Sequence, residues 1–127
     1  MANSKIRKFG TIVSQNRVNI ALANSNVMQI GGGGAIVYQL DERYFLAFVS
    51  VAIHYTANRA MNMAAWKLQV DGQDLNPMYP YFIPCLIDGS NVPYFSYTIN
   101  NKPYYENGPA LSANQTMRWS GVILYYK

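Results

Sequence analysis

Residues suited to acid, base or nucleophilic chemistry are few in this sequence of 127 residues, which contains one histidine, His54, and one cysteine, Cys85. A Ser-His-acid arrangement would need a serine and a carboxylate to converge on His54, and no nucleophile-elbow motif indicates which ones. One histidine and one cysteine also fall short of the three protein ligands that a catalytic zinc ion takes. We therefore expect no catalytic residues, no metal site and no enzymatic activity.

The carboxylates point to no site either. Asp71 and Asp74 lie three residues apart, but the alternating acidic pattern of a helix-loop-helix calcium site is absent, so we assign both to a turn. A carboxylate pair for glycoside cleavage depends on a separation in space that the sequence does not give, and nothing singles out such a pair.

Four consecutive glycines, Gly31 to Gly34, are the sequence feature closest to a phosphate-binding loop. No Gly-Lys-Ser/Thr follows them, and the next segment, residues 35–40, has the apolar and β-branched composition of a strand instead of a helix. We therefore interpret the glycines as a hinge or loop, and no bound cofactor is expected.

Tyrosines give a stronger signal, because the chain has 11 of them together with many asparagines. Such residues stack on sugar rings and donate hydrogen bonds to hydroxyl groups, and they equally anchor protein interfaces or fill the core of a β-sandwich. All three interpretations stay open. The candidates for contact with a glycan or a protein are Tyr79, Tyr81, Tyr94, Tyr104 and Tyr105.

The formal charge of +4 lies in the N-terminal residues 1–17, and the remaining charges cancel. We expect these residues to form a basic arm that docks on a larger assembly, and residues 18–127 to form one domain. Nucleic acid is not an expected partner, because the tyrosines lack interleaved positive charge. Only 13% of the residues are charged, which favours a surface that packs against other copies or against a scaffold. The arm's basic residues are Lys5, Arg7, Lys8 and Arg17.

The elements that must position these residues are mostly strands. Residues 44–56 contain no glycine, proline or charge, and one alternate set, from Phe45 to Tyr55, is wholly apolar or aromatic, which predicts a long central strand with one buried face. A strand of this length predicts a bulge near Ser50. Residues 58–65 are the only stretch with helical propensity and predict at most one short helix.

Other segments alternate or carry turn residues in the same way. Residues 66–70 alternate strictly before Asp71-Gly72, a dipeptide typical of a tight hairpin turn. Three prolines within residues 76–87 restrict that segment to a sheet edge or a crossing strand as far as Pro84, and residues 115–127 predict a strand inside a sheet. The fold class expected is all-β, an antiparallel two-sheet sandwich that is jelly-roll-like, with an up-and-down barrel as the alternative.

Taken together, the basic arm, the glycines, the long strand and two further segments resemble the small all-β structural proteins of bacteriophage virions. These include capsid decoration, head-fibre and tail receptor-binding proteins. The two further segments are residues 66–72 and residues 119–126.

The resemblance implies a jelly-roll module that forms a symmetric homo-oligomer, often a trimer. It also implies attachment to a capsid or tail protein through the N-terminal arm, contact with host surface glycan through the loops, and a location in the virion after assembly in the host cytoplasm. No membrane insertion is expected, since neither a secretory signal nor an apolar run of about 18 residues is present. The alternative function is a lectin-like carbohydrate-binding module.

Overall fold

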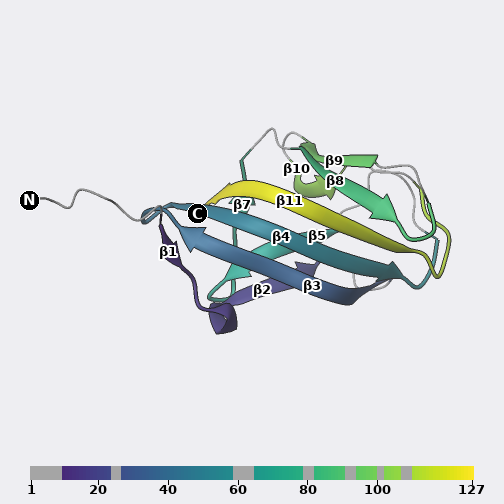
Figure 1. Cartoon of the computed structure of the whole chain (residues 1–127), viewed down its shortest axis with the longest axis horizontal. Helices are drawn as coiled ribbons and strands as arrows, with labels where there is room; N and C mark the ends of the chain where they lie inside the picture. Colours follow the sequence, from purple (N-terminus) through teal and green to yellow (C-terminus); the bar gives the residue numbers. More distant parts are fainter. Residues whose placement is uncertain are drawn as a thin grey trace, which may run out of the picture.

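Two antiparallel β-sheets form most of the described structure, a computed structural model (Figure 1). The residues described are 10–23, 27–58, 65–78, 82–90, 94–99, 102–106 and 110–127, with the backbone alone described for 82, 94–99 and 102–106. The larger sheet has the strand order β1-β3-β4-β11-β8-β9-β10, with β7 also paired to β11, and the smaller sheet has the order β2-β5-β6. The predicted antiparallel two-sheet architecture is confirmed, whereas the jelly-roll-like arrangement is not confirmed by this order.

Strand β4 (Tyr44–Tyr55) is the centre of the larger sheet. It pairs on one side with β3 (Met28–Gln39) and on the other with β11 (Thr116–Tyr126), along almost its whole length. Every second residue faces the smaller sheet and is at most 3% exposed. The sequence prediction of a long central strand with one buried face is confirmed. The buried set is Phe45, Ala47, Val49, Val51, Ile53 and Tyr55.

The four glycines lie inside β3 and not in a loop or hinge, which corrects the sequence interpretation. Their low strand propensity is overridden because β4 supplies pairing partners on both sides of the run. The register shifts between Ile30 and Gly32, so the bulge expected near Ser50 of β4 lies in β3 instead. Gly33 has a φ of +84°, and a Cβ there would lie 1.8 Å from the Ser50 carbonyl oxygen, so only glycine fits this position.

The smaller sheet joins β2 (Val18–Leu22) to β5 (Trp66–Val70), which a tight turn connects to β6 (Gln73–Asp74). Asp71 and Gly72 have φ angles of 53° and 78°, the left-handed values that the predicted hairpin turn requires. Among the described residues, the helical part is one 3-10 turn, η1 (Gln15–Arg17). Residues 59–64 of the predicted short helix lie outside the described residues, while Asn58 and Ala65 at its ends are not helical.

The C-terminal half adds β8 (Phe82–Ile87) beside β11 and continues outward to β9 (Tyr94–Ile99) and β10 (Lys102–Glu106). Pro84 pairs with β9, and the pairing of β8 with β11 begins only at Cys85, so the proline nitrogen interrupts no ladder with β11. Strand β11 lies between β4 and β8, which confirms the predicted inner strand. The short β7 (Asn76–Pro77) pairs with its C-terminal end.

The core lies between the two sheets and includes a contact between two indole rings. Trp66 of the smaller sheet meets Trp119 of the larger one edge to face, with centroids 6.4 Å apart and planes at 72°. Trp119 is 1% exposed, and its Nε1 donor has no hydrogen-bond partner among the described residues. The indole therefore stabilises the fold by packing area and ring contact and not by a hydrogen bond.

The N-terminal residues from Thr11 onward belong to the folded unit. Strand β1 (Thr11–Ile12) pairs with the end of β3, and the next residue, Val13, is 1% exposed in the core. The described fold therefore includes the second half of the predicted arm, residues 1–17. Lys5, Arg7 and Lys8 lie outside the described residues.

Candidate functional site

The outer face of the larger sheet, which points away from the smaller sheet, carries the strongest candidate for a contact surface. The register places three neighbouring side chains in one row across β3, β4 and β11, namely Ile36, Phe48 and Val122. They are 51%, 44% and 49% exposed. Apolar side chains scattered singly over a surface are ordinary, whereas a continuous patch marks a binding site.

A second apolar row lies directly beside the first. It consists of Tyr38, Leu46 and Leu124, all of them half-buried. The ring of Tyr38 meets the ring of Phe48 edge on, with centroids 5.9 Å apart, so the two rows pack against each other. We call these two rows together the ridge; its six residues are Tyr38, Leu46, Leu124, Ile36, Phe48 and Val122.

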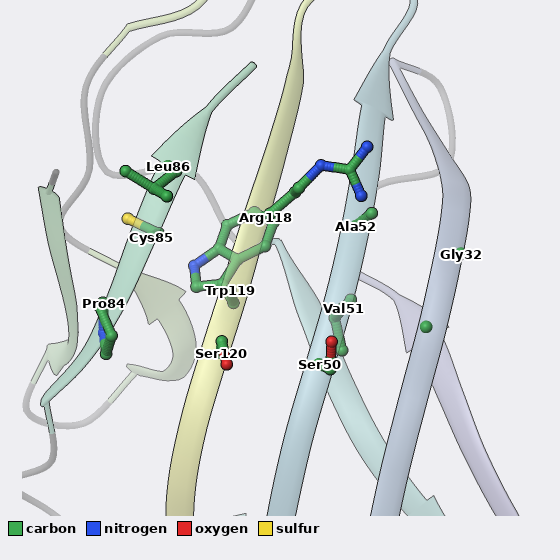
Figure 2. A pocket seen from close by; sticks show the side chains of 11 residues that line it. Gly32, Ser50, Val51, Ala52, Pro84, Cys85, Leu86, Arg118, Trp119 and Ser120 are labelled. Atoms are coloured by element: carbon green, nitrogen blue, oxygen red, sulfur yellow. The ribbon is translucent and has the colours of Figure 1, made fainter. Parts of the chain in front are cut away.

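Small residues occupy the next rows on the same face and form a shallow trough. Gly34, Ser50 and Ser120 are neighbours across the three strands, and Gly32 and Ala52 begin the row beyond them. Figure 2 shows Ser50 and Ser120 side by side on β4 and β11, with Pro84 and Leu86 on β8 along one flank. We call these five residues, Gly32, Gly34, Ser50, Ala52 and Ser120, the trough.

The trough is a real hollow in the surface and not only a row of short side chains. One hollow of about 360 Å³ runs from Gly32 past Ser50 and Ser120 to Pro84 on β8. A second, of about 470 Å³, lies over Gly34 and Ser50 and reaches Phe48 of the ridge. Ridge and trough are therefore adjacent halves of one surface.

An ion pair closes the end of the trough near β8. The Arg118 guanidinium donates hydrogen bonds of 2.7 and 3.1 Å to the two carboxylate oxygens of Asp88. This hydrogen bonding lowers the pKa of Asp88 and raises that of Arg118. Ala52, paired with Arg118 on the neighbouring strand, is only 4% exposed, and Figure 2 shows the arginine side chain reaching over it.

Aromatic rings and one arginine border the opposite end of the ridge. The guanidinium carbon of Arg43 lies 5.7 Å from the ring centroid of Tyr44 and 5.5 Å from that of Tyr126, within the range of cation–π attraction. The turn that holds Arg43 is stabilised by Asp41, whose Oδ1 accepts the backbone N–H groups of Arg43 and Tyr44 at 2.8 Å. These hydrogen bonds lower the pKa of Asp41.

The residues considered first for catalysis do not assemble in the described structure. The Nδ1 atom of His54 lies 3.0 Å from the hydroxyl of Thr116 across the strand pair, and Cys85 is 1% exposed in the core. Within the ranges that the structure describes, no three histidine, cysteine, aspartate or glutamate side chains gather in a way that could hold a metal ion. Those same ranges contain no helix of the length and hydrophobicity needed to cross a membrane.

Most of the site residues predicted from sequence lie where their side chains are not described. Tyr79 and Tyr81 lie outside the described residues, and Tyr94, Tyr104 and Tyr105 are described by their backbone alone, in β9 and β10. Contact with glycan or protein through these tyrosines therefore stays a prediction.

Arg17 is the one of the four basic residues of the predicted arm that the structure describes. Its guanidinium forms two hydrogen bonds of 2.8 Å with the Asp71 carboxylate in the turn of the smaller sheet. This contact raises the pKa of Arg17 and lowers that of Asp71. Its charge is thus compensated within the fold, which leaves Lys5, Arg7 and Lys8 as the basic candidates for docking.

The sequence prediction did not single out the ridge and the trough as a site. The outward residues of β4 and β11 could have been found by alternation, because Leu46, Phe48, Val122 and Leu124 sit opposite the buried set. The residues that β3 contributes could not have been found in this way, because the bulge in β3 decides which of them face outward. Sequence reasoning placed the glycines in a loop and so missed that they form one end of the trough.

In comparisons with known proteins, no family model, no curated protein and no solved structure matches this chain.

Proposed function

We propose that this protein is a structural or adhesion component of a bacteriophage virion, a homo-oligomer that attaches to a capsid or tail protein through its N-terminal segment. The observation that carries the proposal is the uncharged ridge on the outer face of the larger sheet. A surface of this kind favours stable contact with another protein over life as a dispersed monomer.

The charge distribution supports different contacts for the N-terminal segment and for the ridge. Lys5, Arg7 and Lys8 supply a basic N-terminal segment, which suits docking on an acidic surface, while the ridge suits association between copies. The first contact weakens as salt screens the charges, and the second does not. The two contacts are therefore separable by experiment.

Deletion of residues 2–9 tests the attachment. This deletion leaves β1, Val13 and the Arg17–Asp71 pair in place, so the sandwich should fold as before. We expect the truncated protein to keep its β-type circular dichroism spectrum and to be lost from purified particles of the virus that encodes it. The matched control is Arg17→Gln, which removes a basic charge already compensated by Asp71 and should leave incorporation unchanged.

Two results would contradict the proposal at different points. Incorporation of the truncated protein at the normal level would remove the N-terminal segment as the attachment site. Absence of the full-length protein from particles, with the protein free in the infected cell, would reject a virion function altogether.

A further inference from the structure

The geometry of the outer face points to a second copy of this chain as its occupant. We propose that two copies pack face to face about a two-fold axis that runs across the strands, between the row of Phe48 and the row of Ser50. This dimer would supply the contact between copies of the proposed homo-oligomer. Its place in a virion rests on the proposed function, whereas the contact itself rests on the geometry.

Ridge and trough complement each other under that symmetry. The axis reverses the strands, so each residue of the Phe48 row meets the residue of the Ser50 row on the same strand of the other copy. The second row of the ridge then meets the row of Gly32, Ala52 and Arg118. Phe48 of one copy then lies over Ser50 of the other, Ile36 over Gly34 and Val122 over Ser120. A two-fold interface must be complementary to itself, and an apolar row beside a hollow row satisfies this condition.

Gly34 supplies an independent observation. A Cβ added at Gly34 would meet no atom within 4 Å, and this glycine does not have a positive φ. Gly33 differs, since its φ of +84° and its contact with the Ser50 carbonyl require glycine. The fold of one copy thus gives no steric reason for glycine at position 34, whereas the facing Ile36 of a second copy does.

Area and charge are also consistent with a second copy. Three strands about 4.8 Å apart, each with some eleven residues at about 3.4 Å, present a flat projection on the order of 500 Å². Protruding side chains and the flanking β8 raise the accessible area toward the roughly 800 Å² per partner of a standard interface. Neither the ridge nor the trough contains a charged residue. Arg118, which lies over Ala52, is the charged side chain that borders the contact among the described residues of β11, and both oxygens of Asp88 compensate its charge.

The same charge pattern argues against the basic N-terminal segment as the occupant. Asp88 is the carboxylate at the end of the trough, and Arg118 already holds both of its oxygens. The face therefore offers no unpaired acidic group to Lys5, Arg7 or Lys8 among its described residues. A second copy needs none, since its contact is apolar.

Sedimentation equilibrium of the full-length protein at several concentrations tests the inference. We expect a monomer–dimer equilibrium in which Phe48→Ser, which removes the protruding ring, and Ser50→Phe, which fills the hollow, each raise the dimer Kd about a hundredfold, as for a central interface residue. The double variant Phe48→Ser/Ser50→Phe exchanges the large and the small side chain. It should restore the Kd to within about tenfold of the original, because residue 48 of one copy faces residue 50 of the other.

Gly34→Val is the second test, since it fills the trough from β3 and its Cβ meets no atom within 4 Å inside one copy. We expect a folded monomer with an unchanged circular dichroism spectrum. The control is Asn19→Val, which places the same side chain on the outer face of the smaller sheet, where Asn19 is exposed, and should leave the dimer intact.

Three outcomes would overturn the inference. They are a wild-type protein that is a monomer or a trimer, single variants that dimerise normally, and a double variant that stays monomeric when both single variants do. Incorporation into virions separates the two proposals. A monomeric protein that still enters particles rejects self-association and leaves the virion function standing, and a dimer that never enters particles rejects the virion function alone.

Discussion

The two outer faces of this sandwich differ sharply in how they meet solvent. On the smaller sheet, Asn19 donates a hydrogen bond to Gln69 at 2.9 Å, and Gln69 donates one to Asp74 at 2.7 Å. Lys67 donates a third, of 2.9 Å, to the other oxygen of Asp74. The larger sheet carries instead the uncharged ridge and the trough.

This difference is the reason why we propose the outer face of the larger sheet as the contact surface. A chain of hydrogen-bonded polar groups keeps a sheet soluble and discourages other strands and sheets from packing on it. The ridge lacks any such protection, although both sheets belong to one fold and share one core. The row of exposed apolar residues Ile36, Phe48 and Val122 is thus a local property of one face and not a consequence of the composition as a whole.

The strongest test of the comparison is at the core that the two sheets share. Trp119→Ala removes the ring that meets Trp66 and should lower the free energy of unfolding by about 3–5 kcal/mol, measured by urea denaturation. Trp119→Phe should cost much less, because the lost Nε1 donor has no partner among the described residues. Val122→Ala, on the ridge, should cost less than about 1 kcal/mol. An equal cost for Val122→Ala would mean that the ridge is already packed within one copy.

The second test separates two adjacent glycines of β3. Gly33→Ala should destabilise the fold by roughly 2–3 kcal/mol, since alanine adopts its positive φ only with strain and the Cβ meets the Ser50 carbonyl. Gly34→Ala should have no effect or stabilise by about 0.5 kcal/mol, because it restricts the unfolded chain without a clash. Thermal denaturation of both variants measures the difference. A large loss in Gly34→Ala would show that the fold itself requires the trough.

On the smaller sheet, smaller effects are expected. Asp74→Asn removes the charge that pairs with Lys67 while keeping the shape of the side chain, and should cost about 0.5–1 kcal/mol at low salt. The control is Glu42→Gln in the exposed turn before β4, which should change nothing measurable. If Asp74→Asn were as costly as Trp119→Ala, the polar network would be part of the core and not a solvated surface.

The smallest effect expected is a decrease of Tm at low pH. Hydrogen bonds from Arg17 lower the pKa of Asp71, and those from Gln69 and then Lys67 lower that of Asp74. Because the folded pKa lies below the unfolded value of about 3.9, the carboxylates stabilise the fold above that pH, and the contribution is lost as the pH falls through the folded pKa. Tm should therefore be level from pH 7 to 5 and decline below about 4. The decline should be shallower in Asp71→Asn/Asp74→Asn, and an unchanged slope would contradict this assignment.

Several features of the fold follow from local residue patterns, which is why the sequence predicts them. The alternation from Phe45 to Tyr55 gives the buried face of β4 without knowledge of its neighbours. Asp71-Gly72 predicts its turn because these residues accept left-handed backbone angles at low cost. The expectation of no zinc site likewise rests on the composition alone, because the chain has one histidine and one cysteine.

Pairing between distant strands decided what local patterns could not. Four glycines have little strand preference of their own, and only pairing with β4 holds them in β3. The same holds for Thr11 and Ile12, which extend the sheet because β3 offers them an edge.

The sequence by itself determined the strand-rich composition, the central strand and which of its faces is buried. Only the tertiary structure decided that Ile36 stands beside Phe48 and Val122, and that Gly34 stands beside Ser50 and Ser120. The physical reason is the bulge between Ile30 and Gly32, because a shift of one residue in a strand moves every later side chain to the opposite face. Without that shift, Ile36 and Gly34 of β3 would lie on the face opposite to Phe48 and Ser50 of β4.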